Sequence, residues 1–464
     1  MDERFILMED GKEELVDEIL RLRREVEKLR LENDALKKQT DEKIRKGADK
    51  KLNFVKSSDR PGLPPHRWGR KGGHIGVTRP KPTRIDREVE RNASSCPDCR
   101  HPLGKPVDSI EHIQEDIIPS RVEVTRFVHH RYWCPGCQGI VTAPYAPDEV
   151  PHGYLGPRTL ATMVWLKYHL ALPGNKIKDL LCDFCGLNVT EGAIHKALQR
   201  LADHLHMETE PILNAIRQAP YKHADETGWT VNGVGHWLWS FVNGHWAYAT
   251  IKKSRGSQVA KDILGHPFQG IVVSDFFSAY NKLQGIKQKC LVHLRRDMRK
   301  ARDAFAHEPP DDFRNPDKRL KRLLADAQRL ADRRTHLSAR VFARRVRRIK
   351  QRLFDFAAAT YSHKFWKRIS ARLLKHENAI FTFLDHPGLP MDNNAAERSI
   401  KPHVIVRNRS YQNRTASGAK AHGVLTSLLQ TLTLQKRNVV GELSRAYLHH
   451  RHGHTGSALF TSTG

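Results

Sequence analysis

The sequence has few acidic residues relative to its basic ones and lacks any long apolar run. Against 51 Asp and Glu it carries 79 Lys and Arg, which gives a formal net charge of +28. Such an excess repels itself unless a polyanion is nearby, and nucleic acid is the commonest polyanion. An acidic membrane surface is the alternative, but neither end carries a basic amphipathic anchor. The composition therefore indicates a nucleic-acid partner and no membrane.

Signals for export are also missing from the sequence. The first ten residues, MDERFILMED, lack the basic flank and apolar core of a signal peptide, and no apolar run approaches the roughly 18 residues of a membrane span. Four of the seven cysteines form two C-x-x-C pairs, which in a reducing compartment favours metal binding over disulfides. We expect a cytoplasmic, nucleoid-associated protein, and its 464 residues suggest about three domains.

Residues 1–45 are predicted to form a coiled-coil dimerisation helix. The two core positions of a heptad repeat hold Leu15, Leu22, Leu29 and Leu36, and Ile19, Val26 and Asn33. Glutamates at the g positions face Arg or Lys at the e positions of a parallel partner. A single amphipathic helix packed on its own domain is the alternative, but the agreement between core and flanking positions favours a homodimer or larger assembly.

Residues 46–90 read as a basic linker or arm rich in Gly and Pro. Between Arg60 and Arg84 there are seven Lys and Arg and no acidic residue. This composition cannot pack a core, so the segment is either a flexible linker or an arm that follows phosphates or enters a minor groove. In the second case Arg67, Arg70 and Lys71 contact DNA.

Residues 91–150 are predicted to form a small zinc-binding β module. Cys96 and Cys99 form one C-x-x-C pair, and Cys134 and Cys137 form the second. Four thiolates in two such pairs are typical of a closed structural Zn²⁺ site. The 34 residues between the pairs exceed the usual interval, although the segment reads as two strands that would bring the pairs together.

Residues 151–215 read as a helical DNA-binding region that resembles a helix-turn-helix. The helical pattern breaks at Gly186, and a new helix is expected near Thr190. Cys182 and Cys185 form a third C-x-x-C pair without a partner pair. One helical turn apart among Leu and Phe, they are interpreted as core thiols and not as ligands.

From Tyr221 onward the apolar pattern changes to a period of two. Two Asn-Gly pairs separate three strand-like segments, and a helix and the buried strand GIVVSD follow. Asp225 lies on the first strand and Asp275 ends the last one. Three antiparallel strands, a helix and a fourth strand resemble the ribonuclease-H-like core of DDE transposases and integrases, in which the fourth strand pairs with the first. We therefore expect Asp225 and Asp275 side by side.

A third acidic residue, Glu397, lies in the stretch PMDNNAAERSIKP. Asp392 is the expected helix N-cap, and Pro402 is expected at the helix end. Three carboxylates hold two Mg²⁺ (or Mn²⁺) about 4 Å apart, which activate the attacking oxygen and stabilise the leaving oxygen of a phosphodiester. Each of these residues also has a purely structural interpretation. Asp225 and Asp275 could cap turns, and Glu397 could form an ion pair with Arg398 or Arg407. Glu226 is an alternative ligand to Asp225, but neighbouring strand residues face opposite ways.

Four stretches in order resemble the blocks of insertion-sequence-66-type DDE transposases: ADETGW, VVSDFFSAY, CLVHLRRDM and MDNNAAERSIKPHVIVRNRS. The resemblance spans nearly the whole chain. It implies that Asp225, Asp275 and Glu397 are the catalytic triad, supported by Asn393, Asn394 and Arg398. It also implies two small accessory transposition proteins for larger elements. The overall prediction is a multidomain α+β and α/β protein with a coiled coil, a zinc module, a helical region and a ribonuclease-H-like domain.

The predicted catalytic domain has two parts, residues 216–300 and 390–450, separated by a basic helical insertion at 301–389. Residues 314–352 hold fifteen Lys and Arg against three Asp, which favours contact with a DNA backbone over a merely solvated surface. Cys290 and His293 are expected to pack beneath the site, and residues 451–464 to form a disordered tail. Predicted DNA contacts in this half of the chain are Arg295, Arg296, Arg299, Arg344, Arg345, Arg398, Arg407 and Arg409.

The sequence predicts a transposase that binds the ends of a mobile element, cleaves them and transfers 3′ ends into target DNA. Two alternatives stay open: a non-catalytic zinc-dependent DNA-binding regulator or domesticated transposase, and a metal-dependent nuclease without strand transfer. The presence of all three carboxylates argues against the first. The second keeps the same site.

Overall fold

The computed structural model describes residues 122–460 apart from 306 and 411, together with scattered residues between 21 and 105. It divides into two units, Met1–His112 and Ile113–Gly464. None of the described helices is long and apolar enough to cross a membrane.

In the first unit, the described residues between 21 and 32 are helical, and Leu22, Val26 and Leu29 of the predicted heptads are exposed. The rest of the predicted coiled coil lies outside the described residues, as do Arg67, Arg70, Lys71 and Cys96. Dimerisation therefore stays a prediction.

The second unit begins with a small hairpin and continues with helices. Strands β1 (Arg131–Cys134) and β2 (Gly139–Thr142) pair antiparallel, with Cys134 opposite Gly139, so the second C-x-x-C pair forms the turn between them. The helical region consists of α3 (Pro157–Val164), the π-helical turn η1 (Trp165–His169), α4 (Gly174–Cys185), α5 (Glu191–Leu205), the 3₁₀ turn η2 (His206–Glu208) and α6 (Thr209–Gln218).

The predicted break between two of these helices is confirmed. Helix α4 ends where Gly186 adopts φ 70°, a left-handed conformation that glycine enters without a steric penalty. Helix α5 starts after Thr190, whose side chain accepts a hydrogen bond from the backbone N–H of Ala193 at 3.1 Å. Cys182 is half-buried and its thiol donates to Asn188 Oδ1 at 3.2 Å, which agrees with a packing role.

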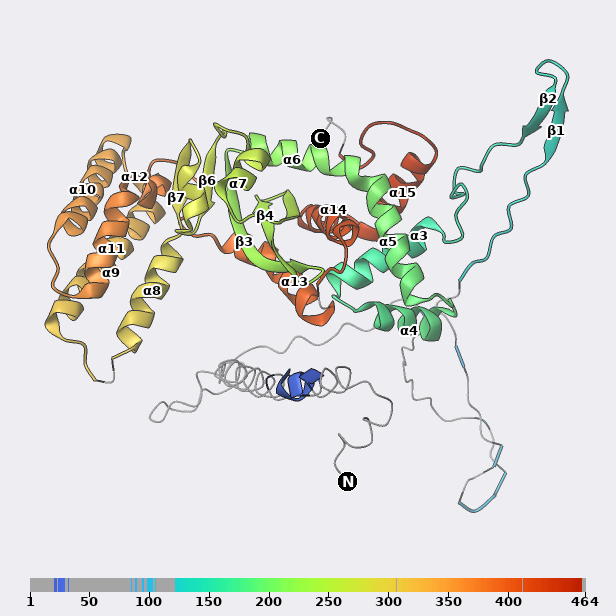
Figure 1. Ribbon diagram of the computed structural model, residues 1–464, viewed down its shortest axis with the longest axis horizontal. Helices are drawn as coiled ribbons and strands as arrows, with labels where there is room; N and C mark the ends of the chain where they lie inside the picture. Colours follow the sequence, from blue (N-terminus) through green and yellow to red (C-terminus); the bar gives the residue numbers. More distant parts are fainter. Residues whose placement is uncertain are drawn as a thin grey trace, which may run out of the picture. The chain divides into compact units, whose positions relative to one another are not determined.

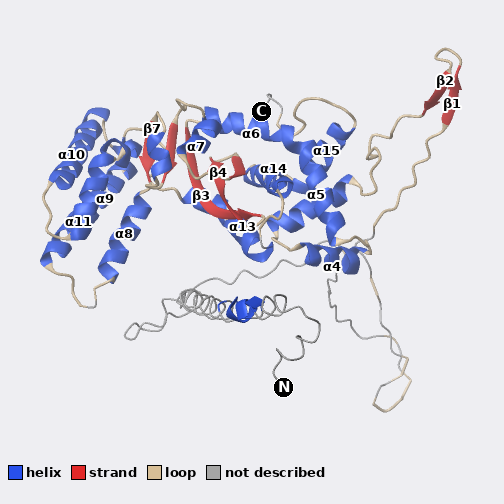
Figure 2. Cartoon of the chain, viewed as in Figure 1, coloured by secondary structure: helices blue, strands red, loops and turns tan. Residues whose placement is uncertain are grey.

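A five-stranded sheet forms the centre of the second unit (Figure 2). Its strands are β3 (Tyr221–Val231), β4 (Val234–Val242), β5 (Ala247–Lys252), β6 (Ile271–Ser274) and β7 (Ile286–Lys289), in the order β5-β4-β3-β6-β7. Strands β3, β4 and β5 are antiparallel neighbours, whereas β6 runs parallel to both β3 and β7. The predicted pairing of the fourth strand with the first is therefore confirmed, with α7 (Ser257–Leu264) in the crossover.

The two Asn-Gly pairs make different turns. Asn232 and Gly233 both have positive φ, 50° and 74°, as a two-residue type I′ hairpin requires. In the second turn the side chain of Asn243 accepts hydrogen bonds from the backbone N–H groups of His245 and Trp246, at 2.9 and 2.8 Å. Its amide therefore closes a longer loop.

Helix α8 (Leu291–Asp303) and the helices of the predicted insertion gather beside the β7 edge of the sheet (Figure 1). Those of the insertion are α9 (Asp311–Asp332), α10 (Ala339–Ala358), α11 (Lys364–Lys375) and α12 (Glu377–Ile380), with the 3₁₀ turns η4 (Arg334–His336) and η5 (Thr382–Leu384). A further 3₁₀ turn, η3 (Ser278–Lys282), lies between β6 and β7. Phe313, Leu324 and Trp366 are fully buried in the core that they share. The insertion is thus a folded helical layer with its own core.

Three helices complete the second unit: α13 (Asn394–Ser410), α14 (Ala416–Leu434) and α15 (Val439–Arg451). Helix α14 packs along the edge strand β5 and buries a stripe of leucines, Leu425, Leu428, Leu429 and Leu432. Ser427 and Thr431 accept hydrogen bonds from the outward N–H groups of Ala249 and Ala247, at 2.8 and 3.1 Å. A Cβ at Gly423 would lie 3.0 Å from the Ala249 carbonyl oxygen, so this glycine permits the close approach. The edge strand is therefore covered.

Two boundary predictions were wrong. Helix α13 was expected to end at Pro402, but it continues to Ser410 with the proline inside. Burial of His403 and Val406 in the following turns offsets the missing N–H of the proline. Residues 451–464 were expected to be disordered, but the described part of this segment is tied to η2: the backbone N–H groups of Ala458 and Leu459 donate to the buried carboxylate of Glu208.

Candidate active site

Strand pairing brings two of the predicted acidic residues together. The parallel register of β3 and β6 sets Tyr221 against Ile271 and His223 against Val273. Continuing this register by two residues sets Asp225 opposite Asp275, which directly follows the last residue of β6. Both carboxyl groups therefore come from the carboxyl-terminal end of the parallel pair, where ligand sites form in α/β sheets.

The third acidic residue, Glu397, stands in the first turn of α13, which packs on β3 and β4. Burial, followed by the negative charge of Glu226 and then that of Asp275, raises the pKa of Asp225 to about 7, and Glu397 adds to this effect. The charges of Asp275 and Glu397 therefore both reach Asp225. The structure thus gathers the three predicted carboxyl groups in one electrostatic cluster.

Each of these carboxyl groups uses one oxygen for its contacts with the described residues. Asp225 Oδ1 accepts from the backbone N–H of Glu226 at 2.9 Å, and Asp275 Oδ1 accepts from that of Phe277 at 2.8 Å. Glu397 Oε1 lies 3.4 Å from Arg296 Nη2 and 3.5 Å from His293 Nε2. The second oxygens are left for other ligands. Such a donor set fits hard divalent cations, which bind carboxylate oxygens.

Within the described residues, no group of three or more His, Cys, Asp and Glu side chains is already arranged around a metal position. The pairing of Glu397 with Arg296 and His293 gives a physical reason, because both side chains hold its carboxylate from the α8 side.

Asn393 links the strand that carries Asp225 to the helix that carries Glu397. Its side chain is fully buried, donates through Nδ2 to the Ala224 carbonyl at 2.9 Å and has Oδ1 3.1 Å from His223 Nδ1. Its backbone N–H donates to Cys290 Sγ at 3.2 Å, so Cys290 packs beneath the site as predicted. His293 instead reaches the site itself, beside Glu397.

Glu226 faces the opposite side of β3 from Asp225. Its carboxylate accepts from Tyr280 Oη at 2.6 Å and from Arg255 Nη2 at 2.8 Å. The Arg255 guanidinium lies between two rings, 4.1 Å from the centroid of Trp237 and 3.9 Å from that of Phe277. Glu226 is therefore held in a structural cluster, which disfavours it as the alternative ligand to Asp225.

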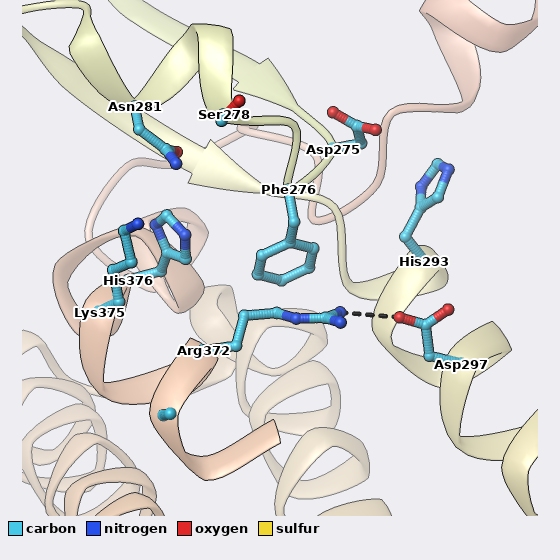
Figure 3. A pocket seen from close by; sticks show the side chains of 10 residues that line it. Asp275, Phe276, Ser278, Asn281, His293, Asp297, Arg372, Lys375 and His376 are labelled. Atoms are coloured by element: carbon cyan, nitrogen blue, oxygen red, sulfur yellow. Dashed lines mark hydrogen bonds and ion pairs between the residues drawn. The ribbon is translucent and has the colours of Figure 1, made fainter. Parts of the chain in front are cut away.

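A cavity of about 520 Å³ opens beside Asp275. Its walls come from the segment after β6, from α8 and from α11 with the residue that follows it. Figure 3 shows Phe276 pointing into this space, with Arg372 ion-paired to Asp297 at 2.7 Å along one side. Sequence reasoning did not single out Arg372, Lys375 or His376. No motif marks them. Arg372 and Lys375 lie on α11, whose sequence pattern indicates only packing, and His376 directly follows that helix.

The predicted DNA-contacting arginines fall into two groups. Arg295, Arg407 and Arg409 donate to acceptors within the chain, namely Gln328, Gly228 and Leu170, and Arg296 pairs with Glu397. These internal contacts disfavour them as primary phosphate ligands. The exposed members of the predicted set are Arg299, Arg344, Arg345 and Arg398.

Helix α10 presents the densest exposed row of arginines. Arg340, Arg344 and Arg348 recur every four residues and Arg347 lies beside them, so all four share one face of the helix. Within the described part of the chain, no acidic side chain pairs with any of them. On the adjacent α9, by contrast, Arg329 pairs with Asp326 at 2.6 Å. The face of α10 therefore carries uncompensated positive charge.

The site thus places acidic side chains at the end of a mixed sheet, within a chain of formal net charge +28. A model of the transposase IS66 family matches residues 152–421, more than half of the chain. A second model, for the zinc-finger binding domain of transposase IS66, matches residues 93–138. The chain belongs to the transposase IS66 family. The second match covers the segment that holds both C-x-x-C pairs.

Two proteins of Sinorhizobium fredii (strain NBRC 101917 / NGR234) are similar to this chain. "Uncharacterized protein y4qI" is 24% identical over 349 residues, which cover 68% of this chain and 63% of that protein. "Uncharacterized protein y4jD" is 23% identical over 389 residues, which cover 76% and 73%. The matched part thus spans less than two thirds of the first relative's length.

Proposed function

We propose that this transposase binds the ends of a mobile DNA element, cleaves them and transfers the 3′ ends to target DNA, with Asp225, Asp275 and Glu397 as the catalytic residues. The observation that carries the proposal is the parallel register that sets Asp225 opposite Asp275, with Glu397 in the first turn of α13, which packs on β3. Like charges gathered in this way are costly unless a cation compensates them.

Two Mg²⁺ or Mn²⁺ ions bound by these residues would supply the activation of the attacking oxygen and the stabilisation of the leaving oxygen. The protein positions the carboxyl groups: Asp225 from the central strand β3, Asp275 from the end of β6 and Glu397 from α13. Arg296 and His293 orient Glu397, and the exposed arginines of α10 hold the DNA backbone. The ribonuclease-H-like fold is part of this proposal, supported by the strand order and by the parallel β3–β6 pair.

The N-terminal segments serve assembly and DNA capture in this proposal. The coiled coil of residues 1–45 joins two or more chains, and the exposed Leu22, Val26 and Leu29 leave a stripe for a partner helix. Cys96, Cys99, Cys134 and Cys137 hold one structural Zn²⁺ that folds the small module. Accessory transposition proteins would act on the assembled complex.

The test uses the purified full chain with DNA carrying the inverted repeat found in the sequence that flanks its gene. A pre-cut repeat end and a supercoiled plasmid are incubated with the protein and Mg²⁺. Joined products support transposition. Nicking without joined products favours a nuclease, and binding without cleavage in either Mg²⁺ or Mn²⁺ favours a DNA-binding regulator.

A further inference from the structure

The cavity beside Asp275 has a composition that the three carboxyl groups do not explain. Its volume of about 520 Å³ falls within the range of about 300–1,000 Å³ typical of ligand pockets. It adjoins the acidic cluster through Asp275, and its two basic side chains, Arg372 and Lys375, come from the insertion. A reacting DNA strand that passes Asp275 must therefore run next to this space.

One of the two basic side chains that line the cavity has no acidic partner among the described residues. Arg372 and Lys375 line it, and Asp297 compensates only Arg372, at 2.7 Å. Lys375 is exposed and forms no ion pair with any acidic residue that the structure describes. The remaining carboxyl group, Asp275, is committed to the acidic cluster. The cavity thus offers an unpaired ammonium group at its wall.

His376 also lines the cavity and lies among positively charged side chains. His376 lies between α11 and α12, with its ring edge against Phe276 at a centroid distance of 5.6 Å. Burial, followed by the positive charges of Lys289, Lys375, Lys287 and Arg372, lowers the pKa of His376 to about 4. Four cations around one neutral imidazole form an environment that favours an anion.

Phe276 gives the cavity an apolar wall as well. The Arg372 guanidinium lies 5.1 Å from the centroid of its ring, and Figure 3 shows the ring directed into the space. An apolar wall beside an unpaired ammonium group matches a nucleotide unit, whose phosphate is anionic and whose sugar is partly apolar.

We propose that this cavity binds one phosphate of the DNA strand, adjacent to the phosphodiester that reacts at Asp275, and that Lys375 and Arg372 are its ligands. The inference rests on the proposed function and extends it, because the insertion then contributes to the substrate site as well as to the outer basic face. A phosphate fixed beside the scissile one sets the position of the reacting strand, and small displacements of a reacting group are costly in rate.

Lys375→Ala is the variant that tests the proposal. Replacing Arg372 would also break its ion pair with Asp297, so its effect would be ambiguous. Lys367→Ala is the matched control, since Lys367 is exposed on the same helix and does not line the cavity. Both changes remove one positive charge from the full chain.

The substrates are duplexes carrying the inverted repeat, each with a neutral methylphosphonate in place of one phosphate near the cleavage position. At one position, the neutral group should slow cleavage by wild type and Lys367→Ala about tenfold, equivalent to about 1.4 kcal/mol. Lys375→Ala should cleave unmodified DNA about tenfold more slowly and should be insensitive to the neutral group at that position. Binding of the same duplexes in Ca²⁺ should show the same pattern.

The proposal is overturned if the losses from Lys375→Ala and from the neutral phosphate multiply at every position, or if Lys367→Ala behaves like Lys375→Ala. An Asp275→Asn variant separates this failure from that of the proposed function. If Asp275→Asn cleaves like wild type, both the function and the cavity proposal fail. If it is inactive while Lys375 shows no coupling, only the cavity proposal fails.

Discussion

The Asn393 side chain donates a hydrogen bond to the carbonyl oxygen of Ala224 across 2.9 Å, although 169 residues separate them in the chain. Ala224 precedes Asp225 on β3, and Asn393 lies four residues before Glu397, at the start of α13. This one contact therefore sets the helix that carries the third carboxyl group against the strand that carries the first. Both ends of the contact are fully buried.

We expect Asn393→Ala to reduce both stability and cleavage. The buried Ala224 carbonyl loses its side-chain donor, which should lower the free energy of unfolding by about 1–3 kcal/mol. If α13 shifts by about 1 Å, cleavage should fall on the order of 100-fold. Urea unfolding and single-turnover cleavage measure the two effects. Asn378→Ala, at an exposed position of α12, is the control and should change neither.

Asp225→Asn should abolish cleavage while increasing the stability of the protein in the absence of divalent ions. Because the folded-state pKa of Asp225 is about 7, against 3.8 ordinarily, the folded protein retains a proton that the unfolded chain releases between these values. Stability from this group is present below pH 3.8 and is lost as pH rises toward 7. An amide stays neutral and avoids that loss. Thermal unfolding in EDTA at pH 5 and pH 8 should show a gain for the variant that is larger at pH 8.

The same variant should also lose the stabilisation that Mg²⁺ or Mn²⁺ gives to the wild type. End binding should change little, because the substitution removes a metal ligand and no phosphate contact. Equal losses of end binding and cleavage would count against Asp225 as a metal ligand.

A buried histidine pair predicts a second dependence on pH. His403 Nδ1 lies 2.9 Å from His422 Nε2, and Gln430 Nε2 lies 3.0 Å from His403 Nε2. The Gln430 amide is the donor, so His403 Nε2 accepts and His403 Nδ1–H donates to His422. Both rings are neutral in this arrangement. Burial lowers the pKa of His403 to about 3 and that of His422 well below 6.5.

Acid should therefore destabilise the fold below pH 6.5, because the unfolded chain binds protons there that these two rings in the folded state do not. Each histidine contributes a loss of about 1.4 kcal/mol per pH unit well below that value. Urea unfolding at pH 7.5 and pH 5.5 measures it. His403→Gln should reduce the difference between the two pH values, whereas the exposed His336→Gln should preserve it. An unchanged difference in His403→Gln would contradict the neutral pair.

Zinc should be bound at about one ion per chain. The backbone N–H of Cys137, then its thiol and the Gly136 N–H, lower the pKa of Cys134, which favours the thiolate that binds metal. Cys134→Ser should lose zinc, measured by release to a colorimetric chelator after thiol modification. Cys182→Ser should keep it, because the Cys182 thiol is bonded to Asn188. Loss of zinc in both variants would show that the third C-x-x-C pair also takes part.

Local signals predicted much of this fold. The Asn232-Gly233 turn, the helix end at Gly186 and the helix start at Thr190 follow from backbone chemistry that neighbouring residues determine. The parallel pairing of β6 with β3 follows from the handed crossover through α7. These features set the positions of Asp225 and Asp275 relative to each other.

Strand β7 was not predicted, because IKQK shows neither apolar alternation nor a turn signal. Its polar side chains are buried through distant partners: Gln288 bonds the Ile380 carbonyl and the Phe383 N–H, and Lys289 Nζ donates to the Asp275 carbonyl at 2.8 Å. The cavity behind Asp275 depends on the same long-range packing. Sequence periodicity has no signal for such contacts, since they are satisfied by residues about 90 positions away.

The uncompensated arginine face of α10 predicts a specific salt dependence of DNA binding. Arg344 and Arg348 lie on that face, so the double variant Arg344→Ala/Arg348→Ala should weaken binding and lower the slope of log Kd against log salt by about 1–2, as expected for one or two lost phosphate contacts. Arg329→Ala and Arg352→Ala, each removing an arginine paired with Asp326, are controls for charge removal and should change the slope less. Fluorescence anisotropy between 50 and 200 mM salt measures the slopes. Equal slopes in all variants would show that α10 does not contact DNA and that its arginines only face solvent.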